Sequence, residues 1–306
     1  MPAVTSTAVT STAVTSTAVT SMRSVDGEAV AREWDASAPS ARSLLLTILG
    51  EFVHPREGQV WTGTLVTALG ALGVEQKSAR QALSRTANEG LLVSSRHGRR
   101  VRWQLTPTGE QLLQQGTERI YGFMRGARDW DGRWLVISVG VPESQRQLRH
   151  RLRTRLTWLG LGSPSPGLWV VPDAGKEERA RAVIEELDLR DRTFAWVGSA
   201  VSTGDPARLL AEAWDLDGVE ARYLEFIDRF EGVVVTTAAA TFVSQVRLIQ
   251  DWRLFPFLDP DLPSELLDHD WPGPRASATF HDRHSRWHRR AQDEWDRMDG
   301  EAGQRI

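Results

Sequence analysis

Cysteine is absent from the sequence, which excludes disulfide bonds, thiolate nucleophiles and thiolate zinc sites. Its absence fits a reducing compartment, so we expect the protein to be cytoplasmic. Lysine is nearly absent as well, because only Lys77 and Lys176 occur among the 37 basic residues. Arginine therefore carries the positive charge, and its planar guanidinium can form paired hydrogen bonds to phosphates and to guanine edges.

Long apolar runs are also missing from the chain. No stretch approaches the roughly 18 to 20 apolar residues that cross a bilayer, so we expect no membrane partner. The formal net charge of −3 excludes a polycation, but the charge is uneven. Residues 41–130 hold 12 Lys and Arg against 7 Asp and Glu, a local net charge of +5. A nucleic-acid binder needs only such a local basic surface.

The first 40 residues have the composition of a tail. Residues 3–21 repeat the pentapeptide Ala-Val-Thr-Ser-Thr, and a period of five matches neither a strand nor a helix. The segment lacks the basic start and the continuous apolar stretch of a secretion signal. We therefore expect residues 1–40 to be a disordered low-complexity tail, with Met22 as an alternative start of the protein.

Residues 41–121 show the order of elements of a winged helix-turn-helix. Apolar residues at helical spacing alternate with turn signals, and a basic turn joins two segments with strand-like alternation. This order places the third helix and the tip of the hairpin on one surface, as docking into a major groove requires. The predicted elements are helix 41–53, strand 59–61, a helix from 62 or 64 to 72, helix 76–89, hairpin 91–105 and helix 107–121.

The third helix and the hairpin supply the candidate DNA-binding residues. The helix has small residues on one side and polar donors on the other, and such donors suit base edges and phosphates. A solvated helix face is the competing interpretation of the same pattern. We expect bases to be read by Arg80, Gln81, Ser84 and Arg85, and phosphates to be held by Lys77, Arg96, Arg99 and Arg100.

The rest of the chain indicates two further domains. Residues 130–200 show three strand patterns and two helical patterns, and a further strand around 159–163 would complete the order β-α-β-β-α-β of a ferredoxin-like domain. Residues 205–298 contain helical patterns and an irregular segment rich in Pro, Asp and aromatics at 255–273. The predicted fold class is therefore α+β, with an N-terminal winged helix-turn-helix, a central ferredoxin-like domain and a C-terminal all-α domain.

Three stretches of the sequence resemble the PaaX family, which represses phenylacetate catabolism. They are SARQALSRTANEGLLVSSRHGRRVRWQLTPTG, WDGRWLVISVGVPESQRQLRHRLRTRLTWLGLGSPSPGLWVVP and DWRLFPFLDPDLPSELLDHDWPG, and the likeness spans residues 41–295. The resemblance implies a homodimer on a palindromic double-stranded DNA operator. It also implies release by an aryl-CoA thioester, commonly phenylacetyl-CoA, and a central domain similar to the nuclease of CRISPR spacer acquisition.

An enzyme is the main alternative, because a metal-dependent nuclease could use the central domain. Such a site needs carboxylates at the end of the first strand, and no Asp or Glu occurs between Trp134 and Pro142. We therefore expect no catalytic residue and no cofactor. A second alternative is a DNA-binding regulator of another pathway, or an activator or architectural protein, without acyl-CoA control.

Two smaller patterns concern possible ligands. His281, His284 and His288 have the spacing of one helical face, so a metal site is conceivable. A solvated or aromatic-packed face is the preferred interpretation, and we expect no metal site. For the effector, an aryl-acyl group needs apolar surroundings and the CoA phosphates need a cation. Trp252, Arg253 and Phe255 supply both kinds of group close together, with Phe257 beside them.

Overall fold

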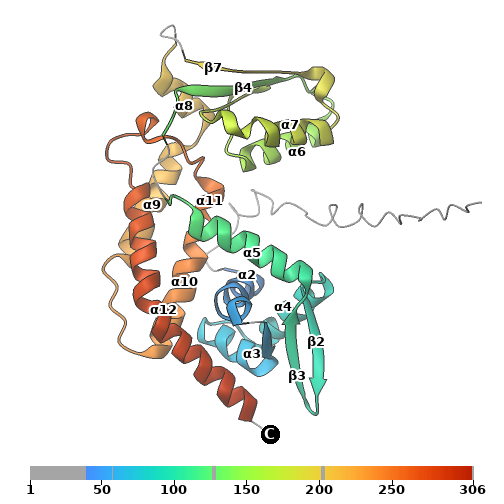
Figure 1. Ribbon diagram of the computed structural model, residues 1–306, viewed down its shortest axis with the longest axis vertical. Coiled ribbons are helices and arrows are strands. Elements are labelled where there is room, and N and C mark those ends of the chain that lie inside the picture. Colours follow the sequence, from blue (N-terminus) through green and yellow to red (C-terminus); the bar gives the residue numbers. More distant parts are fainter. Residues whose placement is uncertain (1–38, 57, 126–128, 201–203, 305–306) are drawn as a thin grey trace, which may run out of the picture.

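The computed structural model describes residues 39–56, 58–125, 129–200 and 204–304. The expected tail, 1–40, therefore lies outside the described residues except for Ser40 and the proline before it. The described chain is a mixed α+β structure that is elongated, with small sheets at opposite ends and long helices running between them (Figure 1). This confirms the predicted fold class at the level of α+β with a helical C-terminal region.

The N-terminal part contains helices and one small sheet. Ser40 caps the first helix, because its Oγ accepts a hydrogen bond from the Ser43 backbone N–H at 3.1 Å. The predicted helix 41–53 is divided, since its second half winds as a π-helix. The elements are α2 (Ala41–Ile48), η2 (Leu49–Val53), η3 (His54–Arg56), β1 (Gln59–Trp61), α3 (Thr62–Ala71), α4 (Gln76–Asn88), β2 (Leu92–His97), β3 (Arg100–Leu105) and α5 (Pro107–Gly122).

The central part has the predicted β-α-β-β-α-β order. Its sheet has the strand order β5-β6-β4-β7, and every neighbouring pair is antiparallel. Helices α6 and α7 pack on one face through a buried cluster that includes Leu135, Leu156 and Ile184. The elements are β4 (Arg133–Val139), α6 (Arg146–Trp158), β5 (Gly162–Ser165), β6 (Leu168–Val171), η4 (Ala174–Lys176), α7 (Glu177–Glu186), η5 (Arg190–Arg192) and β7 (Thr193–Ser199).

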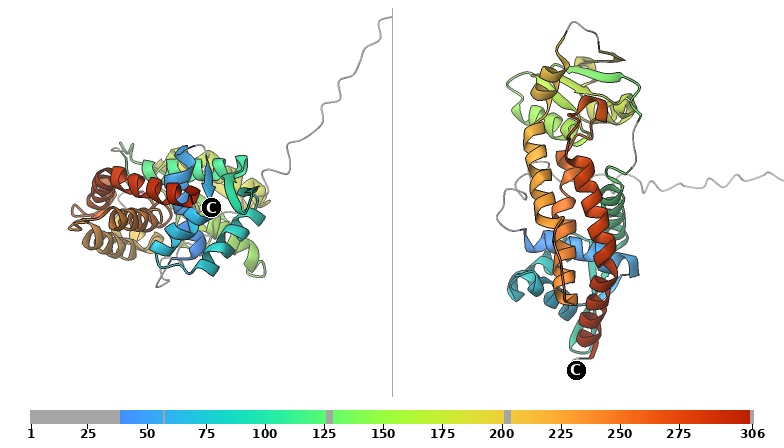
Figure 2. Two further views of the ribbon diagram at one scale, coloured as in Figure 1. Left: turned by 90° about the horizontal axis from the view of Figure 1, so that it is seen from below. Right: turned by 90° about the vertical axis from the view of Figure 1, so that its left-hand side faces the viewer.

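The C-terminal part is helical and returns along the whole molecule. Figure 2 shows α9, α10 and α12 side by side. The end of α12 reaches past the N-terminal part, residues 39–122, which is called the first domain below. The last helix continues to Gln304, beyond residue 298, where the C-terminal domain was expected to end. The elements are α8 (Pro206–Ala213), α9 (Leu216–Phe230), α10 (Ala238–Trp252), α11 (Phe255–Leu258), η6 (Ser264–Leu266) and α12 (Gly273–Gln304).

The first domain shares its hydrophobic core with two C-terminal helices. Phe52 of η2 packs against both Phe242 of α10 and Trp295 of α12, with ring centroids 5.0 and 5.3 Å apart, and these two rings contact each other at 6.5 Å. All three side chains are almost completely buried. At the edge of this core, Gln250 of α10 donates to Ser43 Oγ at 2.5 Å. Removal of α10 and α12 would therefore expose core side chains of the first domain.

The irregular segment after α10 closes the end of the helical bundle. Phe255 stacks on Tyr223 of α9 at 4.2 Å, and the Tyr223 hydroxyl donates to Asp259 at 2.6 Å. Asp259 also accepts the backbone N–H of Asp261, whose φ of 58° forms a tight turn. Burial raises the pKa of Asp259 to about 6, although both hydrogen bonds oppose the rise. The segment thus has a structural role that its sequence did not reveal.

Arg119 of α5 connects the first domain to the central part and to the C-terminal part of the chain. Its guanidinium lies over the rings of Trp158 of α6 and Phe257 of α11, at 4.3 and 4.0 Å from their centroids. It also donates to the Pro256 carbonyl at 2.9 Å. Burial, together with the nearby charge of Arg179, lowers the pKa of Arg119 to about 10, so the side chain remains charged at neutral pH. The charged group lies over two rings that pack on each other, and this contact holds α5 against α6 and α11.

A glycine allows α5 to lie against the start of the hairpin. A Cβ atom at Gly109 would lie 2.2 Å from the Leu91 carbonyl oxygen, whereas one at Gly116 would meet nothing within 4 Å. We predict that Gly109→Ala lowers the free energy of unfolding by about 1–3 kcal/mol or more, because the backbone of the hairpin must move. Gly116→Ala, the matched control, should raise it by about 0.5–1 kcal/mol. Urea unfolding measures both values, and equal effects would contradict the close approach.

Candidate nucleic-acid interface

Helix α4 is positioned by its small inner residues. Ala79, Ala82, Leu83 and Thr86 are buried, and the Thr86 hydroxyl donates to the Ala82 carbonyl at 2.9 Å. Short side chains allow α4 to pack closely against α2 and α3. The turn before α4 contains Gly73, whose φ of 89° suits a residue without Cβ. The inner face therefore fixes which side of α4 points outward.

The outward side of α4 carries the predicted DNA-binding residues. All of them lie on the exposed surface, as does Asn88 one turn further on. None of the three basic residues on this face forms an ion pair with another residue in the described part of the chain. Their donors are therefore available to an anionic partner. The residues are Lys77, Arg80, Gln81, Ser84 and Arg85.

The β2–β3 hairpin presents arginines beside α4, but in two different environments. Gly98 and Arg99 form a two-residue turn, in which Gly98 has a φ of 64°. Arg99 is exposed, and Arg96 donates from Nε to the Gly98 carbonyl at 3.0 Å, which stiffens the turn. Arg96 and Arg99 therefore lie at the tip, where we expected phosphate contacts.

Arg100 lies differently from the other two arginines of the hairpin. Its guanidinium stacks over Trp61 at 4.5 Å and donates to the carbonyl oxygens of Ala302 and Gly303 at 2.9 and 2.5 Å. These carbonyls are at the C-terminal end of α12, where the helix dipole is negative. Arg100 is thus held by contacts within the chain. To bind a DNA phosphate as predicted, it would have to break its hydrogen bonds to Ala302 and Gly303.

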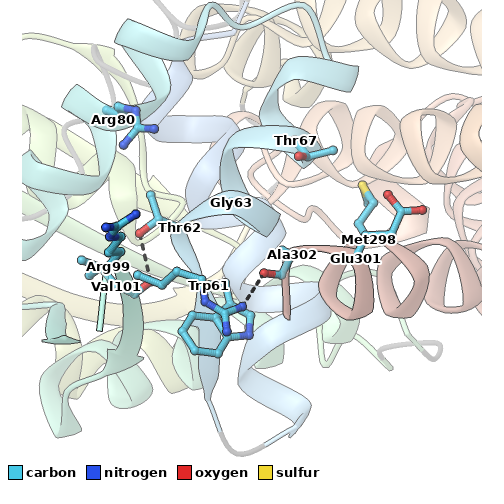
Figure 3. Close-up of a pocket in the computed structure, with 11 residues that line it drawn as sticks. Trp61, Thr62, Gly63, Thr67, Arg80, Arg99, Val101, Met298, Glu301 and Ala302 are labelled. Carbon is cyan, nitrogen blue, oxygen red and sulfur yellow. Dashed lines mark hydrogen bonds between the residues drawn. The ribbon is translucent and has the colours of Figure 1, made fainter. Parts of the chain in front are cut away.

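A cavity of about 300 Å³ lies between α4, the hairpin and the end of α12. Figure 3 shows Arg80 and Arg99 on one side and Glu301 and Ala302 on the other. The structure therefore brings α4 and the hairpin tip together on one surface, and α12 borders that surface. The role of α12 here could not be expected from its sequence, because nothing in its helical pattern shows where its end will lie.

The expected effector residues lie in the aromatic core. Trp252 and Phe255 have no exposed surface, and Trp252 stacks on Phe280 at 4.9 Å. The indole N–H of Trp252 donates to the Ile120 carbonyl of α5 at 3.1 Å. Arg253 donates to Ser43 at 2.7 Å. Effector binding by Trp252, Arg253 and Phe255 stays a prediction, and it would require the packing between α5, α10 and α11 to open.

The three histidines of α12 do not all contact the same residue. His284 and His288 point toward Glu51, whereas His281 packs on Phe280 with ring centroids 5.1 Å apart. Burial lowers the pKa of His281, as does the nearby charge of Arg125. Glu51 was missed in the sequence because it lies 233 residues before His284. No local spacing connects residues so far apart in the chain.

The structure thus has an N-terminal, a central and a C-terminal part. In the N-terminal part, an exposed basic helix and a basic hairpin lie beside the end of a long C-terminal helix. Comparison with known families covers all three parts. Residues 40–109 match the family described as PaaX-like protein, residues 127–210 the PaaX protein central Cas2-like domain, and residues 214–297 the PaaX-like protein C-terminal domain. The chain belongs to the PaaX family, as the resemblance of its three stretches indicated.

One curated relative agrees with this assignment, and one solved structure shares the fold. The transcriptional repressor PaaX of Escherichia coli (strain K12) is 30% identical over 249 residues, which cover 78% of this chain and 77% of that protein. The uncharacterized protein Rv0674 from Mycobacterium tuberculosis has a similar fold, with a TM-score of 0.59 and 23% identity over 84% of this chain and 99% of that one. Among the described residues, no helix is both long and apolar enough to cross a membrane.

Proposed function

We propose that the chain is a transcriptional repressor that binds double-stranded DNA through α4 and the β2–β3 hairpin. The observation that carries the proposal is the exposed basic face of α4 beside the hairpin tip. In this interpretation residues 41–121 form a winged helix-turn-helix, with α4 in the major groove and the hairpin on the backbone. The relative from Escherichia coli, which is named a transcriptional repressor, supports it.

The repressor is proposed to act as a homodimer on a palindromic operator. Two copies would place their α4 helices in successive major grooves, about 34 Å apart. The homodimer is supported by β7, an edge strand of the proposed central domain, residues 130–200. Its Phe194 and Trp196 are 73% and 52% exposed on one face of the strand. Large exposed apolar side chains at a sheet edge favour association.

The regulated operon is proposed to encode phenylacetate-type aromatic catabolism, with an aryl-CoA thioester as the signal. The effector would bind the helical C-terminal domain, 205–298 in our division, and favour an arrangement that binds DNA poorly. Catalysis is not part of the proposal. The central domain would keep a nuclease-like fold without its chemistry, because β4 contains no carboxylate.

Release by the thioester can be measured directly. We expect phenylacetyl-CoA to dissociate the complex between the protein and an operator duplex, whereas free CoA and phenylacetate, the matched controls, leave it bound. Fluorescence anisotropy of labelled DNA, with magnesium present to detect any cleavage, follows the titration. If no aryl-CoA thioester releases the DNA, the protein is a regulator without acyl-CoA control.

Base reading is tested at Arg85. We predict that Arg85→Ala weakens binding to a duplex selected from a random pool by about 1–3 kcal/mol and binding to random DNA only slightly. The physical reason is that a base contact contributes only on the matched sequence. Arg208→Ala removes the same charge from the surface of α8, where Arg208 pairs with Glu212, and should change neither affinity. Equal losses on both DNAs would make Arg85 a phosphate contact instead.

Phosphate binding by the hairpin is tested at Arg99. Arg99→Ala should weaken selected and random DNA by the same factor, because the phosphate backbone is common to both. The slope of log affinity against log salt concentration should fall by about one, because one phosphate contact is lost. Binding measured at several salt concentrations gives this slope. A slope equal to that of the unaltered protein would remove the hairpin tip from the interface.

A further inference from the structure

One carboxylate oxygen of Glu51 is contacted by three side chains that come from two other helices, α10 and α12. Glu51 lies in η2 and is only 8% exposed, whereas His284 and His288 lie one turn apart on α12. His284 Nε2 is 2.9 Å and His288 Nδ1 3.2 Å from Glu51 Oε1. Gln245 of α10 donates to the same oxygen at 2.7 Å. The cluster joins the first domain to the C-terminal helices.

These contacts are too many for one carboxylate oxygen. An ionised carboxylate oxygen offers two lone pairs, yet two imidazole nitrogens and an amide nitrogen all point at Oε1 of Glu51. The second oxygen, Oε2, is already used, because the Tyr121 hydroxyl donates to it at 2.5 Å. A divalent ion between the carboxylate and the two imidazoles would remove the excess, since each imidazole nitrogen would then offer a lone pair instead of a proton.

We propose that Glu51, His284 and His288 form a binding site for a divalent transition-metal ion of the zinc type. Two histidines and one carboxylate are a ligand set that zinc uses in proteins. The three ligand atoms lie within 4.8 Å of one another, and tetrahedral zinc needs its ligands roughly 3.3 Å apart with bonds of roughly 2.0–2.1 Å. Histidines four residues apart on a helix present both rings to one ion.

The surroundings of the three residues resemble the outer shell of a metal site. The Tyr121 hydroxyl holds the free oxygen of the carboxylate, as hydrogen bonds to metal-bound carboxylates commonly do. Gln245 is completely buried, and its Oε1 has no hydrogen-bond partner among the described residues. Rotation of this amide by 180° would turn Oε1 toward the ion as a fourth ligand, and the hydrogen bond from Nε2 to Glu51 would be exchanged for that metal bond. His288 is half exposed, which provides a path for the ion to enter.

The proposal is independent of the proposed repressor function, and its test contains no DNA. The full chain, without a polyhistidine tag, is titrated with zinc by calorimetry and with cobalt by visible absorption, which reports a tetrahedral site. We expect one ion per chain and a higher melting temperature with the metal. His288→Ala should weaken binding at least tenfold, and because this side chain is half exposed the variant should remain folded.

The matched control is His281→Ala, which removes a histidine of the same helix outside the cluster. It should bind the ion as tightly as the unaltered protein. Glu51→Gln is a second variant, which keeps an oxygen at the site but removes its charge, and it should also bind weakly. The proposal is overturned if the unaltered chain binds no ion, or if His288→Ala binds it with unchanged affinity.

Discussion

The packing of Phe52 against Phe242 and Trp295 is the contact on which the arrangement of the molecule depends. It places one aromatic ring from the first domain in the core of two C-terminal helices. The burial of such rings is the largest source of stabilisation at a contact of this kind. Because α10 and α12 complete this core, the orientation of α2, and with it of α3 and α4, is set by the C-terminal end of the chain.

The same helix α12 reaches the proposed DNA-binding surface at its far end. Its last carbonyl groups accept hydrogen bonds from Arg100, and Thr64 of α3 donates to Asp299 at 2.6 Å. A shift of α12 would therefore act on the hairpin through Arg100 and on α3 through Thr64. These contacts connect the C-terminal region to the hairpin and to α3, which packs against α4, and they support the proposed control by an effector.

Much of the local structure could be predicted from the sequence. Periodicity and turn residues predicted β1 (Gln59–Trp61) with the bounds that the structure has, and α4 to within one residue. These elements are determined by neighbouring residues, whose spacing decides which face is apolar. The polar face of α4 was found for the same reason, since its exposure follows from the buried face opposite.

Contacts between distant segments could not be predicted in this way. Nothing near Arg100 in the sequence shows that the end of α12 lies beside it, and nothing near Glu51 points to His284 or His288. For Trp252 and Phe255, the local sequence does not distinguish between two environments, because an aromatic residue in a ligand pocket and one in a core have the same local pattern. Their burial depends on Tyr223, Phe226 and Phe280, which come from other helices.

The central claim is that the first domain owes its stability to the C-terminal helices. Hydrogen exchange of the full chain tests it by comparing amides of α2 and α12 in Trp295→Ala with those in Val234→Ala, which truncates an apolar side chain that is 85% exposed. We predict that Trp295→Ala lowers the unfolding free energy of both helices together by about 3–5 kcal/mol, and that Val234→Ala changes neither. If α2 keeps its protection while α12 loses it, the first domain is stable by itself and the claim is wrong.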